Sequence, residues 1–391
     1  MGKWEMVRLG EVLTDTITGE WGNECIDGDG VNVLRTTNFT NKGIVDFSNV
    51  VVRDISVEKV KKKKLLPHDI ILEKSGGSDN QPVGRVVYFN NADGIFLCNN
   101  FTQILRINSQ TAHSKYVFYH LFNLHRTGVT ELLQNKTTGI RNLQVKSYMA
   151  LPLPLPPLVI QEKIADVFDR ANALIEKRKA QIAKLDLLVK SQFVEMFGDP
   201  VTNTLGWEVK KFADVSKVRQ GLQIPISERH TVAGNNRFKY ITVQYLNGSK
   251  TEEYIENPRP NVICDEGDVL MTRTGNTGLV VTGVKGVFHN NFFLIDFDRK
   301  SLIKTFLVYY LNTKWIQYEL LRRAGSSTIP DLNHSEFYKI AVCLPPLSLQ
   351  TQFATFVERV EAQKTQLKKS LELLELNYKS LMQKCFSGEI I

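Results

Sequence analysis

The sequence predicts an α+β fold in which two globular α/β domains are joined by two long helices that form an antiparallel coiled coil, with a pseudo-two-fold internal repeat. Three observations predict it. The chain repeats itself, each repeat closes on a long apolar seam at helical spacing, and the interior of each repeat contains short β runs. We therefore expect globular domains at 1–153 and 201–342, followed by helical segments at 154–200 and 343–391.

The ends of the two repeats match better than their interiors. Trp4–Val12 recurs as Trp207–Val215, and Leu155–Phe197 aligns without a gap on Leu344–Phe386, where fourteen of forty-three pairs are identical. Matching ends, the frame of each repeat, are expected where both repeats dock a common partner. Diverging interiors are expected where each repeat recognises something different. Three weaker interior matches pair Asp69–Leu72 with Asp268–Met271, Asn99–Phe101 with Asn290–Phe292, and Thr138–Ile140 with Ser327–Ile329.

Each Leu-Pro-Pro segment opens a long helix. Roughly forty residues at about 1.5 Å each give a helix of about 60 Å, which is longer than the helices of ordinary globular cores, the alternative interpretation. The first helix should stop at Gly198, before Pro200. Two seams of equal length favour packing on each other. The first comprises Phe168, Ala171, Ile175, Arg178, Ile182, Leu185, Val189, Gln192 and Met196, and the second Val357, Val360, Lys364, Leu367, Leu371, Leu374, Tyr378, Leu381 and Cys385.

The bulk composition describes a soluble globular chain. It has 391 residues, of which 42% are hydrophobic, and we expect it in the cytoplasm because no apolar run predicts a membrane span or a signal peptide. Its five cysteines are far apart, so neither a disulfide framework nor a zinc site is expected. The net charge of +8 is compatible with a nucleic-acid partner, although many basic proteins bind none.

Sequence motifs for catalysis are missing. The chain has neither the Asn/Asp-Pro-Pro-aromatic motif that adenine methylation needs nor a phosphate-binding Gly-x-x-x-x-Gly-Lys loop. Asp69 with Glu73-Lys74 is similar to a nuclease metal site, but the spacing is wrong and the second repeat has Thr272-Arg273 there. We therefore expect a binding protein without catalytic residues, metal site or bound cofactor.

Two pairs of loops suit DNA. A cation precedes a glycine-rich turn at equivalent places in Lys74–Ser78 and Arg273–Gly278, and a second pair, Lys136–Asn142 and Arg322–Thr328, is rich in cations and hydroxyls. Such turns also occur in proteins that bind nothing, and the run Lys61–Lys64 is interpreted as a solvated face. The candidate DNA-binding residues are Arg35, Asn38, Lys74, Ser75, Arg85, Lys136, Arg141, Gln244, Arg273, Asn276, Arg322 and Arg323.

The ends of the opening strands carry candidates for base reading. In our alignment Asn38 and Gln244 coincide, and an amide suits a bidentate contact to adenine, as Arg35 suits guanine. The alternative is that these amides cap the backbone at the strand ends.

The doubled Trp-Glu starts and the doubled Leu-Pro-Pro-Leu-x-x-Gln segments leading into seamed helices resemble the specificity subunits of type I restriction-modification enzymes. The resemblance implies target recognition domains at 1–153 and 201–342 that each read one part of a bipartite site on double-stranded DNA, with the helices as spacer. It implies two methyltransferase subunits and restriction/translocase subunits as partners, which would carry S-adenosylmethionine, ATP and Mg²⁺. A related combined cleavage-modification enzyme, or a coiled-coil scaffold or repressor without a methyltransferase partner, remains an alternative.

Overall fold

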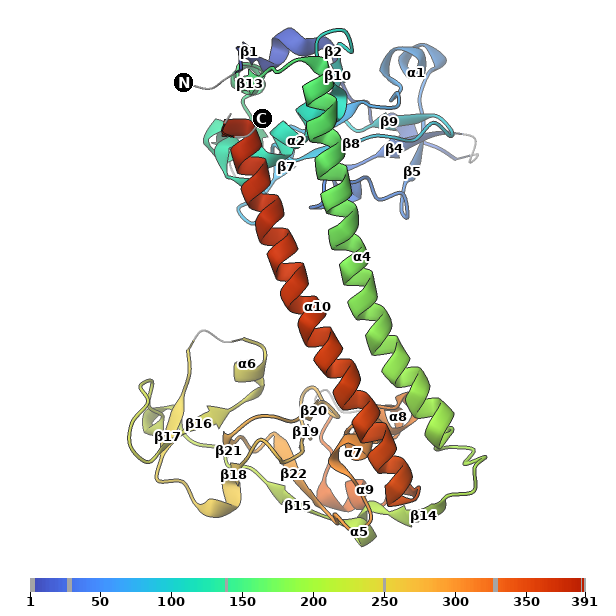
Figure 1. Ribbon diagram of the computed structural model, residues 1–391, viewed down its shortest axis with the longest axis vertical. Helices are drawn as coiled ribbons and strands as arrows, with labels where there is room; N and C mark the ends of the chain where they lie inside the picture. Colours follow the sequence, from blue (N-terminus) through green and yellow to red (C-terminus); the bar gives the residue numbers. More distant parts are fainter. Residues whose placement is uncertain are drawn as a thin grey trace. The chain divides into compact units, whose positions relative to one another are not determined.

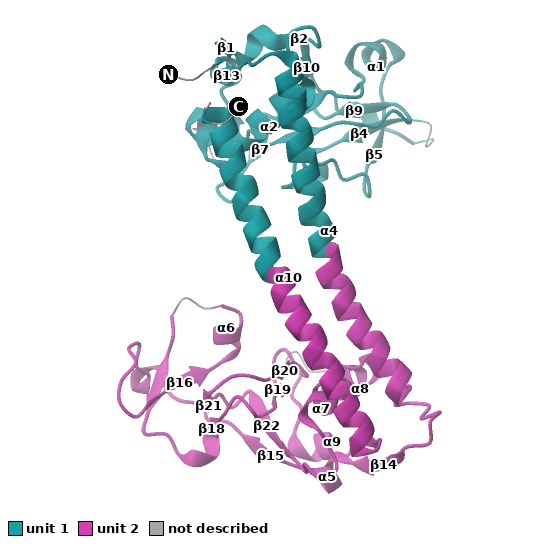
Figure 2. Ribbon diagram, viewed as in Figure 1, with its two compact units in different colours: residues 1–179, 369–391 teal, residues 180–368 magenta. Residues whose placement is uncertain are grey.

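Figure 1 shows the computed structural model, which describes residues 4–26, 30–137, 140–248, 251–325, 330–387 and 389. The chain forms two compact units. Unit 1 comprises residues 1–179 and 369–391, and unit 2 comprises residues 180–368 (Figure 2). Two long helices, α4 (Leu158–Phe197) and α10 (Leu347–Ser387), are each divided between the units. Each unit therefore contains the first part of one long helix and the last part of the other.

Unit 1 is built on antiparallel sheets with one parallel strand pair. Its four-stranded sheets have the orders β2-β10-β6-β8 and β3-β5-β4-β9, and β4 and β9 are parallel. Smaller sheets join β11-β12-β7 and β1-β13. The elements are β1 (Met6–Arg8), η1 (Leu9–Val12), β2 (Leu13–Thr18), β3 (Asn23–Glu24), β4 (Val31–Leu34), η2 (Thr36–Asn38), β5 (Val51–Asp54), α1 (Val57–Lys63), β6 (Ile70–Glu73), β7 (Ser75–Gly77), β8 (Val86–Tyr88), β9 (Phe96–Cys98), β10 (Thr102–Ile107), α2 (Ser114–Arg126), η3 (Val129–Leu133), β11 (Gln134–Thr137), β12 (Ile140–Leu143), α3 (Val145–Met149) and β13 (Pro152–Pro154).

Unit 2 repeats this plan. Its four-stranded sheets have the orders β15-β22-β19-β20 and β17-β16-β21-β18, with β16 and β21 parallel, and β14 pairs with β23. The elements are β14 (Glu208–Lys211), α5 (Phe212–Val215), β15 (Ser216–Gln220), η4 (Ile226–Glu228), β16 (Arg237–Ile241), α6 (Val243–Leu246), β17 (Tyr254–Glu256), η5 (Pro260–Val262), β18 (Ile263–Cys264), β19 (Leu270–Thr272), β20 (Val280–Val281), β21 (Gly286–Phe288), β22 (Phe292–Phe297), α7 (Lys304–Leu311), α8 (Lys314–Ala324), α9 (His334–Tyr338) and β23 (Ala341–Leu344). The predicted α+β repeat is confirmed.

The helices form the predicted antiparallel coiled coil, visible within each unit. In unit 1 the Asn172 amide donates to the Tyr378 hydroxyl over 3.0 Å, and in unit 2 the Lys364 ammonium lies 2.6 Å from Asp186. All eighteen predicted seam residues are buried or half-buried, as packing of apolar side chains requires. The first helix ends at Phe197, and Gly198 follows with φ of 73°, the predicted left-handed stop.

In each unit a buried glutamine fastens the first part of one long helix to the globular part. Gln161 accepts the His113 N–H over 2.8 Å and donates to the Pro156 carbonyl, and it is fully buried. Gln350 repeats this contact with Ile303 over 2.8 Å and with Pro345. Because a buried amide must be paired, these contacts fix the start of the long helix against the residue that precedes α2 in unit 1 and α7 in unit 2.

The repeat register differs in one region from our alignment. The Asn99 N–H donates to the Leu34 carbonyl over 2.9 Å, and the His289 N–H donates to the Ile241 carbonyl over 3.0 Å. Because Leu34 and Ile241 end the equivalent strands β4 and β16, Asn99 corresponds to His289, so the predicted match to Asn290 is wrong by one residue. In the same register Gln244 is equivalent to Thr37, so the prediction that Asn38 and Gln244 occupy equivalent positions is also wrong. The match of Asp69 with Asp268 is confirmed, since each carboxylate accepts the N–H three residues before it.

Candidate nucleic-acid interface

In each unit the glycine-rich turn lies beside the second loop. From the sequence, these two segments are separate candidates for DNA contact. In unit 1, β7 of the first turn pairs with β12 of the second loop, and the Lys74 carbonyl accepts the Leu143 N–H over 2.8 Å. In unit 2 the Arg273 carbonyl accepts the Leu332 N–H over 2.9 Å. Lys74 and Arg273 are therefore equivalent, as predicted. Thr138, Gly139 and residues 326–329 lie outside the described residues, and so does the side chain of Lys136 in β11.

A hydroxyl joins the two loops in both units. The Ser75 hydroxyl donates to Asn142, and the equivalent Thr274 hydroxyl donates to the Asp331 carboxylate. The next residue is a left-handed glycine in each turn, with φ of 89° at Gly76 and 84° at Gly275, which a side chain would disfavour. The two turns thus have the same backbone shape, with backbone and hydroxyl groups suited to phosphate oxygens.

The cation of each turn has a different environment in the two units. The Arg273 guanidinium donates to Asp331 over 2.7 Å and lies 5.6 Å from the centre of the Phe293 ring. Unit 1 has the neutral Asn142 in place of Asp331, and the Lys74 ammonium donates to the Thr18 hydroxyl over 3.2 Å. Burial lowers the pKa of Lys74, with a minor opposing effect of Cys98. The unit 1 turn therefore lacks the carboxylate that partly neutralises Arg273 in unit 2.

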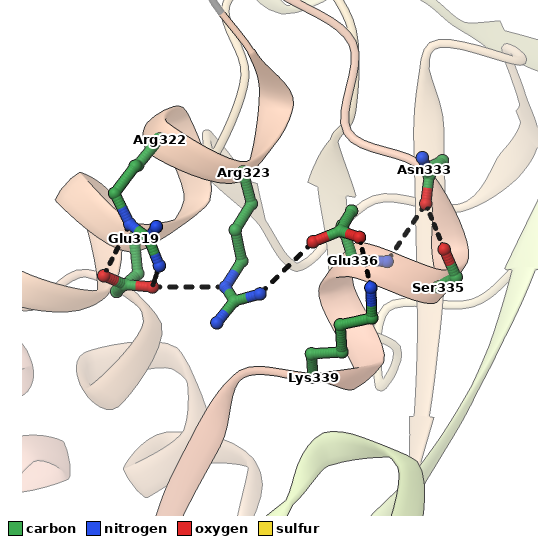
Figure 3. A network of polar contacts seen from close by, with 7 residues as sticks. All are labelled: Glu319, Arg322, Arg323, Asn333, Ser335, Glu336 and Lys339. Atoms are coloured by element: carbon green, nitrogen blue, oxygen red, sulfur yellow. Dashed lines mark hydrogen bonds and ion pairs between the residues drawn. The ribbon is translucent and has the colours of Figure 1, made fainter.

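The remaining arginines of the second loops are held by carboxylates. The Arg141 guanidinium is 15% exposed and donates to Asp79. Figure 3 shows the corresponding region of unit 2, where the Arg322 and Arg323 side chains both reach Glu319, over 2.7 and 3.1 Å, and Arg323 also reaches Glu336. These ion pairs compete with phosphate for the arginine donors. Arg322 is the most available of the three, because half of its side chain is exposed.

Two residues predicted to read bases are used within the protein. Asn38 is 3% exposed, its carbonyl oxygen accepts the Arg35 N–H over 2.9 Å, and its amide donates to the Asp46 and Asn49 carbonyls. This is the alternative considered from sequence, an amide that caps the backbone at a strand end. Arg35 donates to the Asn49 carbonyl over 3.0 Å. Gln244 and Asn276, by contrast, are exposed.

Arg85 belongs to the interior of unit 1. Its guanidinium forms a two-pronged ion pair with Glu73, at 2.7 and 3.2 Å, and donates to the Thr36 and Phe39 carbonyls. The Arg85 and Glu73 side chains are 12% and 2% exposed. These four bonds give Arg85 a structural role and contradict its selection as a DNA contact. From the sequence alone, a cation beside β-rich residues is expected to be exposed, because the buried carboxylate that pairs with it lies on another strand.

Two hollows in the structure were not predicted from the sequence. One of about 800 Å³ in unit 1 is lined by both long helices and by α2, and one of about 340 Å³ in unit 2 lies beside α6. The second brings Arg229 and His289 to Gln244 from separate segments, and no local motif announces such a convergence. Among the residues that the structure describes, no group of three or more His, Cys, Asp or Glu could hold a metal ion, and no helix is long and apolar enough to cross a membrane.

Comparison with known proteins gives a consistent result. The family profile described as the type I restriction modification DNA specificity domain matches residues 1–185 and 204–377. The putative type I restriction enzyme MjaX specificity subunit of Methanocaldococcus jannaschii is 21% identical, with 99% of this chain and 93% of the relative covered. The EcoKI specificity subunit of Escherichia coli is 22% identical, with 93% and 83% covered.

Solved structures show the same fold. A chain from a study of complex assembly and conformational transition of the type I R-M system superposes with a TM-score of 0.64 at 17% identity, covering 100% of this chain and 98% of that one. The type I restriction-modification S subunit from M. genitalium superposes with a TM-score of 0.58 at 16% identity, covering 98% and 96%.

Proposed function

Because the chain belongs to the type I restriction modification DNA specificity family, its role is DNA recognition, and we propose that each unit reads one half of a bipartite target. The observation that carries the proposal is the duplicated turn. A cation, a hydroxyl clamp and a left-handed glycine recur at Lys74–Gly76 and Arg273–Gly275. Phosphate contacts of this kind position a protein on DNA, while side chains that differ between the units select the bases.

The partners follow from the same family membership and from the repeat. We propose that the repeated frame, fastened by Gln161 and Gln350, docks two methyltransferase subunits, and that restriction/translocase subunits join them in the cytoplasm. S-adenosylmethionine, ATP and Mg²⁺ would be bound by those subunits, and this chain would contribute recognition without catalysis. The absence of catalytic motifs from its sequence supports this division of labour.

We further propose that the coiled coil sets the number of unread base pairs between the two half-sites. A test is to insert four residues between Lys177 and Ala183, with a matching insertion in α10. The insertion lengthens the coil by about 6 Å and turns it only about 40° beyond a full turn. Because duplex DNA rises about 3.4 Å per base pair, the spacer should grow by one or two base pairs.

The readout is the map of methylated adenines produced by the chain assembled with its methyltransferase subunit. The expected result is the same two half-sites at a longer spacing. An unchanged spacer with full activity would show that the coil does not set the distance. A wild-type chain that directs no site-specific methylation would contradict the recognition role itself.

A further inference from the structure

The hollow of about 340 Å³ in unit 2 has a fixed floor. It lies where the parallel strands β16 and β21 end, next to α6. Tyr240 forms the floor and is 1% exposed, and its hydroxyl donates to the Leu222 carbonyl over 2.8 Å and accepts the Ile224 N–H over 3.1 Å. A buried ring held at both sides of its hydroxyl provides a rigid surface.

The wall of the hollow is equally fixed. The Arg229 guanidinium donates to Glu253 over 3.1 Å and to the Ile224 carbonyl over 2.7 Å, and it lies 5.1 Å from the centre of the Tyr240 ring. Its charge is therefore matched within the protein. Because these partners occupy its donors, Arg229 is not free to bind a phosphate. It keeps the shape of the hollow instead.

Three other lining groups are available. The side-chain amides of Gln244 and Asn291 have no hydrogen-bond partner among the described residues. His289 Nδ1 accepts the Asn291 N–H over 3.1 Å, so in the neutral ring Nε2 carries the hydrogen and can donate. Burial first and Arg229 second lower the pKa of His289, which favours that neutral ring. The hollow thus offers two amides and one N–H donor.

We propose that this hollow reads the edge of an adenine, with Gln244 as the specificity-determining residue and His289 and Asn291 beside it. The inference deepens the proposed function and rests on it. A glutamine amide pairs with adenine through N6 and N7 in a two-pronged contact. The Asn291 carbonyl also accepts the Arg273 N–H over 2.7 Å, so the hollow adjoins the cationic turn. Base reading and phosphate contact are therefore neighbours in unit 2.

Unit 1 presents different groups from the same strand ends. The register places Arg35 and Thr37 where unit 2 has Thr242 and Gln244, and Asn99 where it has His289. In the described part of unit 1, the Arg35 Nε and the Asn99 Oδ1 are buried without a hydrogen-bond partner. One backbone plan with two sets of donors and acceptors suits two different half-sites.

The test compares Gln244→Ala, Gln244→Glu and the wild-type chain, each assembled with the methyltransferase subunit. Gln181→Ala is the matched control, because Gln181 is an exposed glutamine of unit 2 on α4, outside the hollow. The measurements are the methylated-adenine map and the affinity for duplexes with each base at each position. Circular dichroism verifies that the variants are folded.

Gln244→Ala should reduce discrimination at one position of one half-site by about 5- to 150-fold, the range for a two-pronged base contact. Gln244→Glu should move the preference at that position toward cytosine, whose N4 donates to a carboxylate. Unchanged discrimination in both variants, or an equal loss at both half-sites, would overturn the inference while leaving the recognition role in place. A wild-type chain without site-specific methylation would overturn both.

Discussion

Replacing Arg85 with leucine breaks the buried ion pair of unit 1 and leaves Glu73 alone in the interior. Glu73 is 2% exposed, and the Arg85 guanidinium donates a hydrogen bond to each of its carboxylate oxygens. Removing one partner of a buried pair typically costs about 3–5 kcal/mol, because the remaining charge is uncompensated. We expect a destabilisation of this size, measured by hydrogen exchange of the β6 and β8 amides, with β19 of unit 2 as the unaffected reference.

The second repeat supplies the control. The backbone bonds that join Glu73 to Gly84 and Arg85 recur between Thr272 and the pair Gly278 and Leu279, so unit 2 has a threonine and a leucine at the equivalent places. The double variant Glu73→Thr with Arg85→Leu removes both charges and should recover most of the loss. If Arg85→Leu alone leaves β6 protection unchanged, or if the double variant is as unstable as the single one, the reasoning about the buried charge is wrong.

The loss should also depend on pH. Burial raises the pKa of Glu73, and Arg85 opposes that rise. When the folded pKa of a carboxyl exceeds its unfolded value, the folded state holds the proton more tightly, so stability falls as pH rises between the two values. Removing Arg85 should widen that window. Arg85→Leu should therefore destabilise unit 1 more at pH 7 than near pH 5, and an equal loss at both would contradict this account.

Two further outcomes are expected. Arg273→Ala should weaken DNA binding at all sequences and reduce the slope of log affinity against log salt by about one, whereas Arg299→Ala, an exposed cation outside the turns, should leave both unchanged. An unaltered slope for Arg273→Ala would argue against a phosphate contact. Lys364→Ile introduces the residue found at the equivalent position, Ile175. It should lower the free energy of unfolding by at most about 1 kcal/mol, or raise it, because Asp186 and Glu361 remain half-exposed. A loss of several kcal/mol in denaturant unfolding would show that the coil depends on this lysine.

The sequence was informative where one periodicity decides the structure. The seam through Phe168 and Tyr378 could be predicted because 3-4 spacing places apolar side chains on one helix face. The equivalence of Lys74 and Arg273 followed from the repeat. Asn99 was aligned one residue away from its true equivalent, because the Asn-Asn-Phe match fixed the alignment. The backbone hydrogen bonds that set the true register cannot be seen in the sequence. Arg85, Asn38 and the hollow beside α6 depend on partners from distant strands, which spacing along the chain does not reveal.

The division of the long helices has a consequence for the order in which the units are completed. Unit 2 is one continuous stretch, 180–368, and all of its core is present once Lys368 has been synthesised. The core of unit 1 includes Tyr378, Met382 and Cys385, almost two hundred residues after its last preceding segment ends at Lys179. The first part of the chain to leave the ribosome is therefore the last to close its core, with the apolar face around Phe168 waiting uncovered while unit 2 folds.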